Sequence, residues 1–514
     1  MIRVHPRKSA VYAAILLVAL GFRLFLALRL ANDEPDDGRV YSQIARNVLE
    51  QHVYSHDAQP PYNPSIIRLP GYPLFLVAIY SVFGHGNNTA VRVVQALMDT
   101  ATCGLIACVV FEWADEERRH RAALIALGLA AVCPFTAIYV ATILTEVPTN
   151  FLAVAMVLTA TFAFKKNSLR WWIVTGLIAG LAVLFRPDSG LFAAAIGVTL
   201  MLSTRWRIAI LSAALFSIAF CIVLVPWTIR NGRVFHVFQP LSPAHGEMPD
   251  EFVARGYLLW VRTWIDDSKY VGPALWSLDM RQMYVENFPA RAFDSKEERD
   301  RVAALLDKYN HPDGEEEADE DQTSDDDEED EPEEEPEEEE PPQPEEANVE
   351  MTPDIDAGFA QIGRERIARA PLRYYVLLPL KRAKTLWFDT HSQYYPFNGD
   401  LLPLEDLDYD IHQQYWLPLF AALTWIYTLL GVIGGWLLWR SRDRNARRWL
   451  LLAVLLIFLR LGFFATLENP EPRYVVELFP FLIMLAGAGA SMIKASAKAT
   501  ETDVAVPTAE YSPD

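Results

Sequence analysis

Cysteine is scarce in this chain, with four residues among 514. All four lie inside apolar runs, and none stands beside a histidine at the spacing of a metal site: Cys103, Cys108, Cys133 and Cys221. Cysteines in such surroundings are typical of small core side chains. We therefore expect neither a disulfide nor a zinc site.

Positive charge is absent from one long stretch. Residues 313–350 contain 24 Asp and Glu but no Lys or Arg, and without them the net charge changes from −21 to +3. The acidity is therefore local and gives no information about the partners of the rest of the chain. The stretch also lacks apolar periodicity, so it cannot bury surface, and we expect it to be disordered.

The first apolar run lacks a small-residue cleavage site, which favours a retained anchor over a cleaved signal peptide. Hydrophobic residues make up 52% of the chain, and several runs exceed the roughly 20 residues that cross a bilayer. We predict an all-α integral membrane protein with about ten transmembrane helices, a number good to about one pair because two spans are short. The predicted spans are 11–30, 89–110, 122–141, 147–164, 171–185, 191–202, 208–227, 416–439, 449–466 and 475–493.

The distribution of Lys and Arg predicts the topology. The proposed inner loops and termini carry eighteen of these residues, whereas the three short outer turns carry only Arg186 and Arg473. Short loops rich in Lys and Arg stay on the cytoplasmic side, so both termini are expected inside. The predicted parts are a membrane core (1–230), an outer segment (231–411) that includes the acidic tract (313–350), C-terminal membrane helices (412–495) and a cytoplasmic tail (496–514).

The first outer loop, residues 31–73, concentrates charge at the membrane face. It opens with four carboxylates and closes with Arg68 before a Pro-Gly-Tyr-Pro turn that contains Tyr72. The apolar stretch 74–83 is too short to span a bilayer, so we expect interfacial helices here. The four carboxylates belong to Asp33, Glu34, Asp36 and Asp37.

Asp37 and Tyr41 are four residues apart and would share one face of a helix that begins near Asp37. The alternative is an acidic first turn that interacts only with the helix dipole. Glu146 stands in a short outer turn before Pro148, where it is either a surface acid or part of a site.

Three arginines on the predicted outer side stand beside proline or aromatic residues: Arg68, Arg186 and Arg473. Each could extend to lipid headgroups. They could equally hold a phosphate, because arginine binds phosphate oxygens through paired hydrogen bonds between charged groups. Arg23 and Arg460 lie within predicted spans, where unpaired cations are costly, and are secondary candidates.

Five segments together resemble the GT-C superfamily of polyprenyl-phosphate-sugar glycosyltransferases, in particular its protein O-mannosyltransferase-like and aminoarabinose-transferase-like members. These segments are DGRVYSQIARN, RLPGYPLFLVAIYSVFG, ILTEVP, RPDSG and EPRY. The resemblance covers about 1–230 and 355–490 and leaves out the acidic tract. It implies a sugar donor linked to a polyprenyl phosphate and inversion at the anomeric carbon.

The resemblance also implies roles for individual residues. The family pattern has an Asp-Glu pair four residues before a tyrosine, whereas this chain has Asp37-Gly38, so Asp37 is the implied catalytic base and Asp36 the fallback. Glu146 matches a second acid, which with Asp37 could hold a divalent cation such as Mg or Mn. Arg68 and the Arg473-Tyr474 pair match positions that meet the lipid phosphate.

The sequence therefore predicts a membrane glycosyltransferase, transferring a hexosyl or pentosyl group, in a bacterial-type inner membrane. Its active site would face the outer, periplasmic side. Its expected partners are a polyprenyl-phosphate-linked sugar, an acceptor lipid, glycan or protein, and membrane lipid, with no nucleic acid. The alternative is a transporter or flippase for a lipid-linked sugar, which would more often place polar residues at the membrane midplane.

Overall fold

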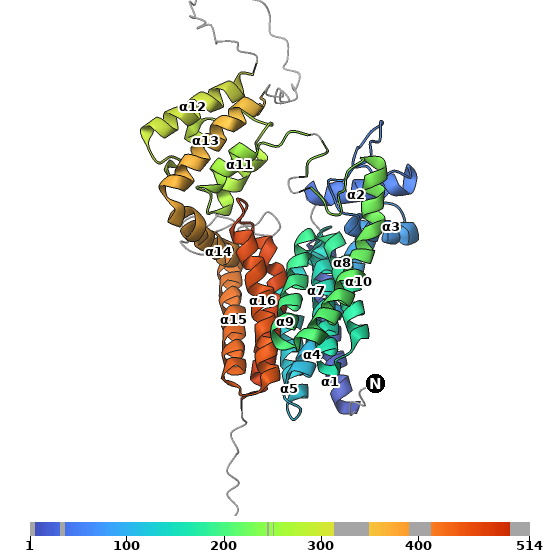
Figure 1. Ribbon diagram of the computed structural model, residues 1–514. Helices are drawn as coiled ribbons and strands as arrows, with labels where there is room; N and C mark the ends of the chain where they lie inside the picture. Colours follow the sequence, from blue (N-terminus) through green and yellow to red (C-terminus); the bar gives the residue numbers. More distant parts are fainter. Residues whose placement is uncertain are drawn as a thin grey trace, which may run out of the picture.

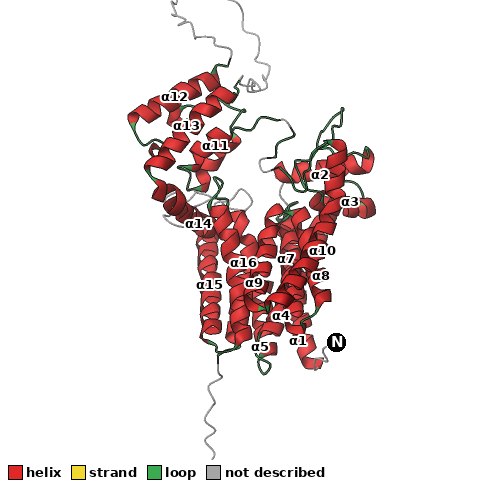
Figure 2. Ribbon diagram, in the orientation of Figure 1, coloured by secondary structure: helices red, strands yellow, loops and turns green. Residues whose placement is uncertain are grey.

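The computed structural model describes residues 6–30, 36–243, 246–249, 251–312, 349–389 and 413–493. Within these ranges every regular element is a helix and no strand occurs, which confirms the all-α fold class (Figure 2). The α-helices are α1 (Pro6–Arg29), α2 (Asp36–Glu50), α3 (Gly71–Phe83), α4 (Asn88–Trp113), α5 (Arg119–Ala131), α6 (Pro134–Ala137), α7 (Glu146–Lys166), α8 (Leu169–Phe185), α9 (Gly190–Ser203), α10 (Trp206–Val234), α11 (Arg255–Arg262), α12 (Lys296–Asn310), α13 (Pro353–Arg369), α14 (Leu378–Phe388), α15 (Gln413–Arg440), α16 (Arg444–Ala465) and α17 (Phe479–Ala490).

Short 3-10 or π helices connect several of these elements. They are η1 (Ile138–Ala141), η2 (Pro187–Ser189), η3 (Ser268–Tyr270), η4 (Gly272–Trp276), η5 (Val285–Asn287), η6 (Ala290–Ala292), η7 (Arg373–Leu377) and η8 (Pro472–Leu478). Both η2 and η8 begin with a proline and lead directly into α9 and α17, respectively.

Seven helices in the described ranges are long and apolar enough to cross a membrane: α1, α4, α7, α10, α15, α16 and the η8–α17 unit. An eighth span results if α5 and the following α6–η1 segment, which bend by 51°, are taken together. The two remaining predicted spans, 171–185 and 191–202, correspond to the helices α8 and α9, which have 17 and 14 residues. Because this is shorter than the roughly 20 residues that cross a bilayer, the number of ten spans stays a prediction.

The broken span at α5 is stabilised by a buried arginine. Arg23 of α1 is fully buried, pairs with Asp99 of α4 at 2.6 Å, and donates to the carbonyls of Ala130 and Ala131 at 3.1 and 2.9 Å. Carbonyl groups at a helix end need partners inside an apolar layer, and Arg23 supplies them here. This candidate of the sequence analysis is thus engaged in holding the helix break.

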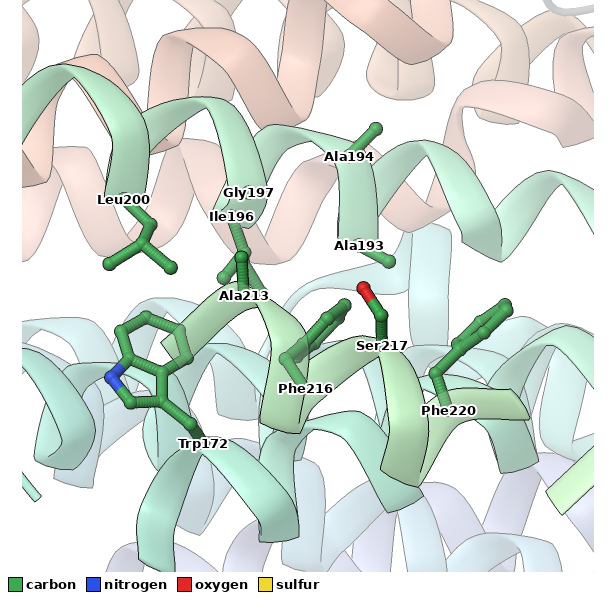
Figure 3. Close-up of a pocket in the computed structure, with 10 residues that line it drawn as sticks. All are labelled: Trp172, Ala193, Ala194, Ile196, Gly197, Leu200, Ala213, Phe216, Ser217 and Phe220. Atoms are coloured by element: carbon green, nitrogen blue, oxygen red, sulfur yellow. The ribbon is translucent and has the colours of Figure 1, made fainter. Parts of the chain in front are cut away.

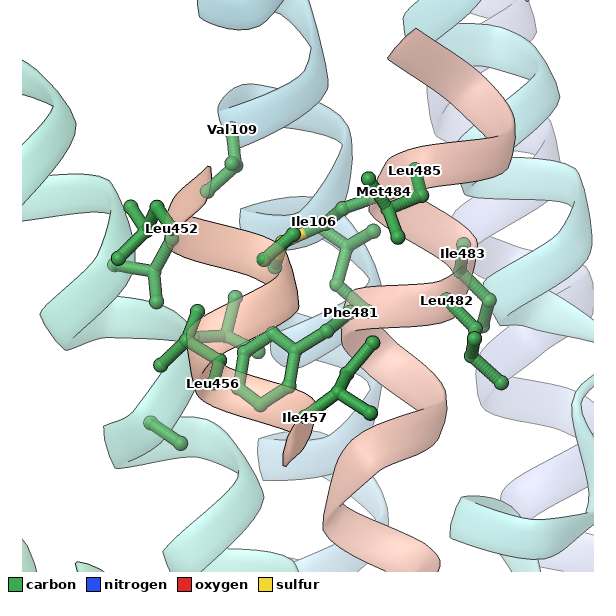
Figure 4. Close-up of a cluster of buried hydrophobic side chains, with 14 of the residues drawn as sticks. Ile106, Val109, Leu452, Leu456, Ile457, Phe481, Leu482, Ile483, Met484 and Leu485 are labelled. Carbon is green, nitrogen blue, oxygen red and sulfur yellow. The ribbon is translucent and has the colours of Figure 1, made fainter. Parts of the chain in front are cut away.

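The membrane helices pack side by side in one bundle (Figure 1). Glycine allows a close approach between α8 and α10, because a Cβ at Gly180 would come within 2.7 Å of the Phe220 carbonyl oxygen. Further along the bundle, apolar side chains of α4, α16 and α17 interlock (Figure 4). Between two of these helices, Trp113 of α4 stacks on Trp449 of α16 with ring centroids 5.5 Å apart.

A separate helical domain, formed by α11, α12 and α13, lies beyond the end of the bundle (Figure 1). Its core is aromatic: Trp260, Trp264 and Phe359 are all buried. The loop helices α2 and α3 lie beyond the same end of the bundle. This end, which we call the loop end, therefore gathers the segments that the sequence analysis placed outside the membrane. The predicted interfacial segments are helical, while their position at a membrane interface stays a prediction.

Candidate active site

Helix α2 places the principal candidate, Asp37, in its first turn at the loop end. The helix is amphipathic, with Ile44 and Ala45 fully buried against the rest of the molecule. As the spacing predicted, Tyr41 follows one turn after Asp37, and its ring packs edge-on against Tyr72 of α3 with centroids 5.1 Å apart. Tyr72 is itself buried and donates to Gln95 Oε1 at 2.8 Å. The side chain of Asp36 lies outside the described part of the structure, as do Asp33 and Glu34.

Asp37 lies between two of the predicted arginines. Its Oδ1 is 3.0 Å from Arg68 Nη2, and its Oδ2 is 3.0 Å from Arg473 Nη2. Burial alone would raise the pKa of Asp37, but Arg473 and Arg68 outweigh it and hold that pKa below its ordinary value. The side chain remains 23% exposed. Asp37 is therefore an ionised carboxylate that is within reach of a ligand.

Glu146, the first residue of α7, pairs with Arg186 at the end of α8 at 3.0 Å. Arg186 also contacts Asp188 and Glu477, each at 3.3 Å. Burial alone would lower the pKa of Arg186, but Asp188, Glu477 and Glu146 raise it well above its ordinary value. Arg186 is therefore a permanent cation surrounded by three carboxylates.

Tyr474 connects these two groups of charges. Its ring receives Arg473 at 5.4 Å and Arg186 at 5.6 Å from the ring centroid, and it stacks on Phe464 at 4.5 Å. Burial, and then the charge of Asp37, raises the pKa of the nearby Tyr41 to about 12, so this phenol stays neutral. The sequence candidates Asp37, Arg68, Arg473, Tyr474, Arg186, Glu146 and Tyr41 thus form one site.

Arg460, a further candidate for phosphate binding, lies deeper. It is fully buried on α16, pairs with Asp188 and Glu477, and donates from Nε to the carbonyl of Tyr474 at 2.9 Å. The rings of Phe192 and Phe464 lie 5.1 Å from its guanidinium carbon. In this arrangement Arg460 supports the carboxylates that surround Arg186.

Two members of this network were missed by the sequence analysis, Asp188 and Glu477. Asp188 lies inside the RPDSG segment, and Glu477 follows Arg473 by four residues at the start of the apolar run VVELFPFLIML. A carboxylate within an apolar run is costly unless it is paired. That cost was the available signal, because it implies arginine partners for Glu477.

The predicted pair of metal ligands, Asp37 and Glu146, does not fit a divalent cation in this arrangement. Both oxygens of Asp37 and one oxygen of Glu146 are paired with guanidinium groups, which would repel a second cation placed at these atoms. Over the part of the chain that the structure describes, no group of three or more His, Cys, Asp and Glu side chains is arranged to hold a metal ion.

An apolar cavity of about 300 Å³, whose lining includes none of these site residues, lies between α8, α9 and α10 (Figure 3). It is lined by aromatic and aliphatic side chains such as Trp172, Phe216 and Leu200, with Ser217 supplying a hydroxyl. Because it presents no titratable group, it offers no acid or base for catalysis.

Two solved structures are similar to this chain. The archaeal oligosaccharyltransferase AglB from Archaeoglobus fulgidus, in complex with an inhibitory peptide and a dolichol-phosphate, matches with a TM-score of 0.48 and 10% sequence identity, over 94% of this chain and 50% of AglB. ArnT from Cupriavidus metallidurans, bound to undecaprenyl phosphate, matches with a TM-score of 0.38 and 13% identity, over 95% of this chain and 78% of ArnT. The chain thus spans about half the length of AglB. Among proteins with curated functions, the sequence has no significant match.

Residues 63–229 match the family described as dolichyl-phosphate-mannose-protein mannosyltransferase. This region includes Arg68, Glu146, Arg186 and Asp188, whereas Asp37 precedes it, and the remaining arginines of the site follow it. For residues 63–229 the match confirms the resemblance that the sequence motifs indicated, a similarity to the GT-C superfamily of polyprenyl-phosphate-sugar glycosyltransferases.

Proposed function

We propose that this integral membrane protein transfers a sugar from a polyprenyl phosphate to a hydroxyl or amine acceptor, with inversion at the anomeric carbon. The observation that carries the proposal is the position of Asp37, a reachable carboxylate held at 3.0 Å by both Arg68 and Arg473. One carboxylate and two guanidinium groups are the chemistry needed to take a proton and to hold a phosphate.

In the proposed reaction the acceptor oxygen or nitrogen attacks the anomeric carbon from the face opposite the phosphate. The bond between that carbon and the phosphate oxygen breaks, and its electron pair remains on the phosphate. Asp37 takes the proton from the acceptor. Arg68 and Arg473 stabilise the charge that grows on the departing phosphate.

The same two arginines also hold Asp37 when no donor is present, and they lower its pKa. A carboxylate held in this way is a weak base. When the donor phosphate binds to Arg68 and Arg473, it competes with Asp37 for their N–H groups. The pKa of Asp37 then rises, so the base becomes stronger once the donor is in place.

Sugar hydroxyls could be recognised at the start of α7. Glu146 and Asn150 are one helical turn apart and 1% exposed, and the Oε2 of Glu146 and the Oδ1 of Asn150 have no hydrogen-bond partner in the described structure. Buried acceptor oxygens are rarely left unpaired in proteins. We propose that hydroxyl groups of the transferred sugar or of the acceptor donate to them.

A transporter for lipid-linked sugars is the competing function. Incubation of the purified protein with radiolabelled polyprenyl-phosphate sugars and acceptor extracts separates the two. We expect label to appear in the acceptor, with release of polyprenyl phosphate, and the Asp37→Asn variant to lose this transfer. Binding of the intact donor without bond cleavage, across the sugars and acceptors tried, would contradict the enzyme and favour the transporter.

The active site is proposed to face the outer, periplasmic side of a bacterial-type inner membrane. The Lys and Arg distribution supports this orientation. A cysteine at Ser324, which lies outside the described residues, should react with an impermeant reagent in intact cells. A cysteine at Ser441, in the loop between α15 and α16, should not. The reverse labelling pattern would place the site on the cytoplasmic side.

A further inference from the structure

We propose that residues 372–388, formed by η7 and α14, lie in the membrane leaflet at the loop end, bind phospholipid there, and carry the α11–α13 domain on the membrane surface. The inference concerns the attachment of that domain and does not depend on the proposed reaction.

One face of this segment packs against the protein. Leu378, Arg382 and Leu386 follow one another at four-residue spacing and are 5%, 1% and 0% exposed. The other face is both apolar and uncovered: Leu372 is 65%, Tyr375 is 67% and Leu380 is 63% exposed. Val376 and Leu377 extend the same exposed surface. Such a density of large apolar side chains marks an interaction surface.

Contacts with α15 show how deep the segment reaches. Trp387 donates from Nε1 to Thr428 Oγ1 at 2.9 Å, and Phe388 stacks on Trp425 with centroids 4.5 Å apart. The part of α15 from Pro418 to Arg440 is long and apolar enough to cross a membrane. At about 1.5 Å per residue, Thr428 lies roughly 15 Å into this span. The end of α14 is therefore inside the apolar layer of the membrane.

The position of Leu380 follows from this depth. It precedes Trp387 by seven residues, or about 10 Å along the helix, which is less than the depth reached by Trp387. Leu380 therefore lies between Trp387 and the headgroups, in the outer part of the apolar layer. The exposed side chains Trp425, Ile426 and Leu429 of α15 face the same layer. This continuity identifies lipid as the occupant of the exposed face.

The polar side chains of the segment suit an interfacial position. Lys381 is 63% exposed on its side chain and pairs with Asp266 at 3.2 Å, and Lys384 is also exposed. Lysines beside an apolar face extend toward phospholipid headgroups while their stems remain in the apolar region. The segment therefore matches the two chemical layers of one leaflet.

The same segment holds the α11–α13 domain. Arg382 donates from Nε to the carbonyl of Ile265 at 2.7 Å, and Thr385 donates to the carbonyl of Asp266 at 2.7 Å. Nearer its start, Arg373 bonds both carboxylate oxygens of Asp294, at 2.7 and 2.8 Å. A lipid-embedded α14 would consequently fix the height of this domain above the bilayer.

Spin-label accessibility in the full-length protein tests the inference. The background carries Cys108→Ala and Cys221→Ala, because these cysteines are exposed and the other two are buried. Single cysteines replace Leu372, Tyr375 and Leu380, with Leu429 on α15 as the lipid-facing reference and Asp300 on α12 as the water-facing reference. Each labelled variant is placed in phosphatidylcholine and phosphatidylglycerol vesicles, and collisions with oxygen and with a water-soluble nickel complex are measured.

We expect the oxygen-to-nickel ratio at Leu380 and Tyr375 to approach that at Leu429 and to exceed that at Asp300 clearly. A ratio at both positions like that at Asp300 would overturn the inference, since the face would then lie in water. Protection from both reagents, with spin coupling between copies, would also overturn it and identify a second copy as the occupant. Using three labelled positions guards against one substitution that prevents folding.

Discussion

Asp37 and Arg473 are 436 residues apart in the sequence, and their side chains meet at 3.0 Å. The contact joins the first turn of α2 to η8, which leads into α17. Arg68 closes the same arrangement from the other carboxylate oxygen. The candidate site therefore forms only when these segments, far apart in sequence, are assembled. Each of its charges can be tested by a separate substitution.

The Asp37→Asn variant should lose turnover and bind lipid phosphate more tightly. The amide keeps the shape but cannot accept a proton, so turnover should fall about 10²- to 10⁴-fold, the usual contribution of a general base. It also releases Arg68 and Arg473 from the Asp37 carboxylate, which then no longer competes with phosphate for them. Turnover and the Kd for polyprenyl phosphate are measured together.

Asp57→Asn is the matched control for Asp37→Asn, because Asp57 lies in the same loop and accepts from the Asn63 backbone N–H. This control should leave turnover and the Kd for polyprenyl phosphate near those of the unchanged protein. An Asp37→Asn protein with full turnover would remove the base from this position. Lost turnover with weakened phosphate binding would instead place Asp37 among the groups that support the donor site.

Removal of either arginine should weaken donor binding. Arg68→Ala and Arg473→Ala each remove a hydrogen bond between charged groups, worth about 1.5–3 kcal/mol, or roughly ten- to more than a hundredfold in Kd. Arg46→Ala, on the same helix as Asp37, serves as the control. Unchanged affinity for polyprenyl phosphate in both site variants would show that the phosphate binds elsewhere and would direct attention to Arg186.

The ion pairs of Asp37 predict how stability depends on pH. The folded-state pKa of Asp37 is lowered, so its contribution is complete above the ordinary aspartate pKa of 3.8 and is lost as the pH falls through the lower folded value. The difference in unfolding midpoint between the unchanged protein and Asp37→Asn should therefore be constant near neutral pH and shrink in acid. A difference that grows on acidification would contradict the direction of this pKa shift.

Arg460 should matter for stability as well as for activity. It is fully buried and pairs with Asp188 and Glu477, so Arg460→Met would leave two buried carboxylates with less compensation, a loss of about 3–5 kcal/mol. The expected result is a lower unfolding midpoint, measured in detergent. Arg473→Ala, whose side chain is partly exposed, should lower it less. Equal midpoints for the two variants would show that the ion pairs of Arg460 with Asp188 and Glu477 do not stabilise the fold.

Sequence patterns predicted the long helices, because these depend on local rules, and the candidate site residues lie together, although their roles stay predictions. Hydrophobic runs marked the helices, and the spacing of Asp37 and Tyr41 marked the start of α2. The partners of each charge could not be predicted in the same way. Whether Arg186 pairs with Glu146, with Asp188 or with Glu477 depends on how helices far apart in sequence are assembled. The break at α5 was missed for the same reason, since its stabilising group, Arg23, comes from α1.

The acidic tract should be dispensable for transfer, because the chain on either side of it is already joined. The backbone N–H of Glu350 donates to the carbonyl of Tyr309 at 3.3 Å, and that of Met351 donates to Asp279 Oδ1 at 2.9 Å. The chain thus leaves and re-enters the α11–α13 domain at one place. Replacement of residues 314–348 by a short Gly/Ser linker would shorten this loop without moving its ends, and shorter loops cost less entropy to close.

The deletion variant should keep turnover within a few-fold of the unchanged protein and unfold at the same or a higher temperature. Turnover with radiolabelled donor and thermal unfolding in one detergent preparation provide the measurement. A control deletion that also removes Glu350 and Met351 breaks both hydrogen bonds and should lower the unfolding midpoint. A folded 314–348 deletion without activity would contradict the prediction, because the tract would then take part in binding the acceptor or the donor.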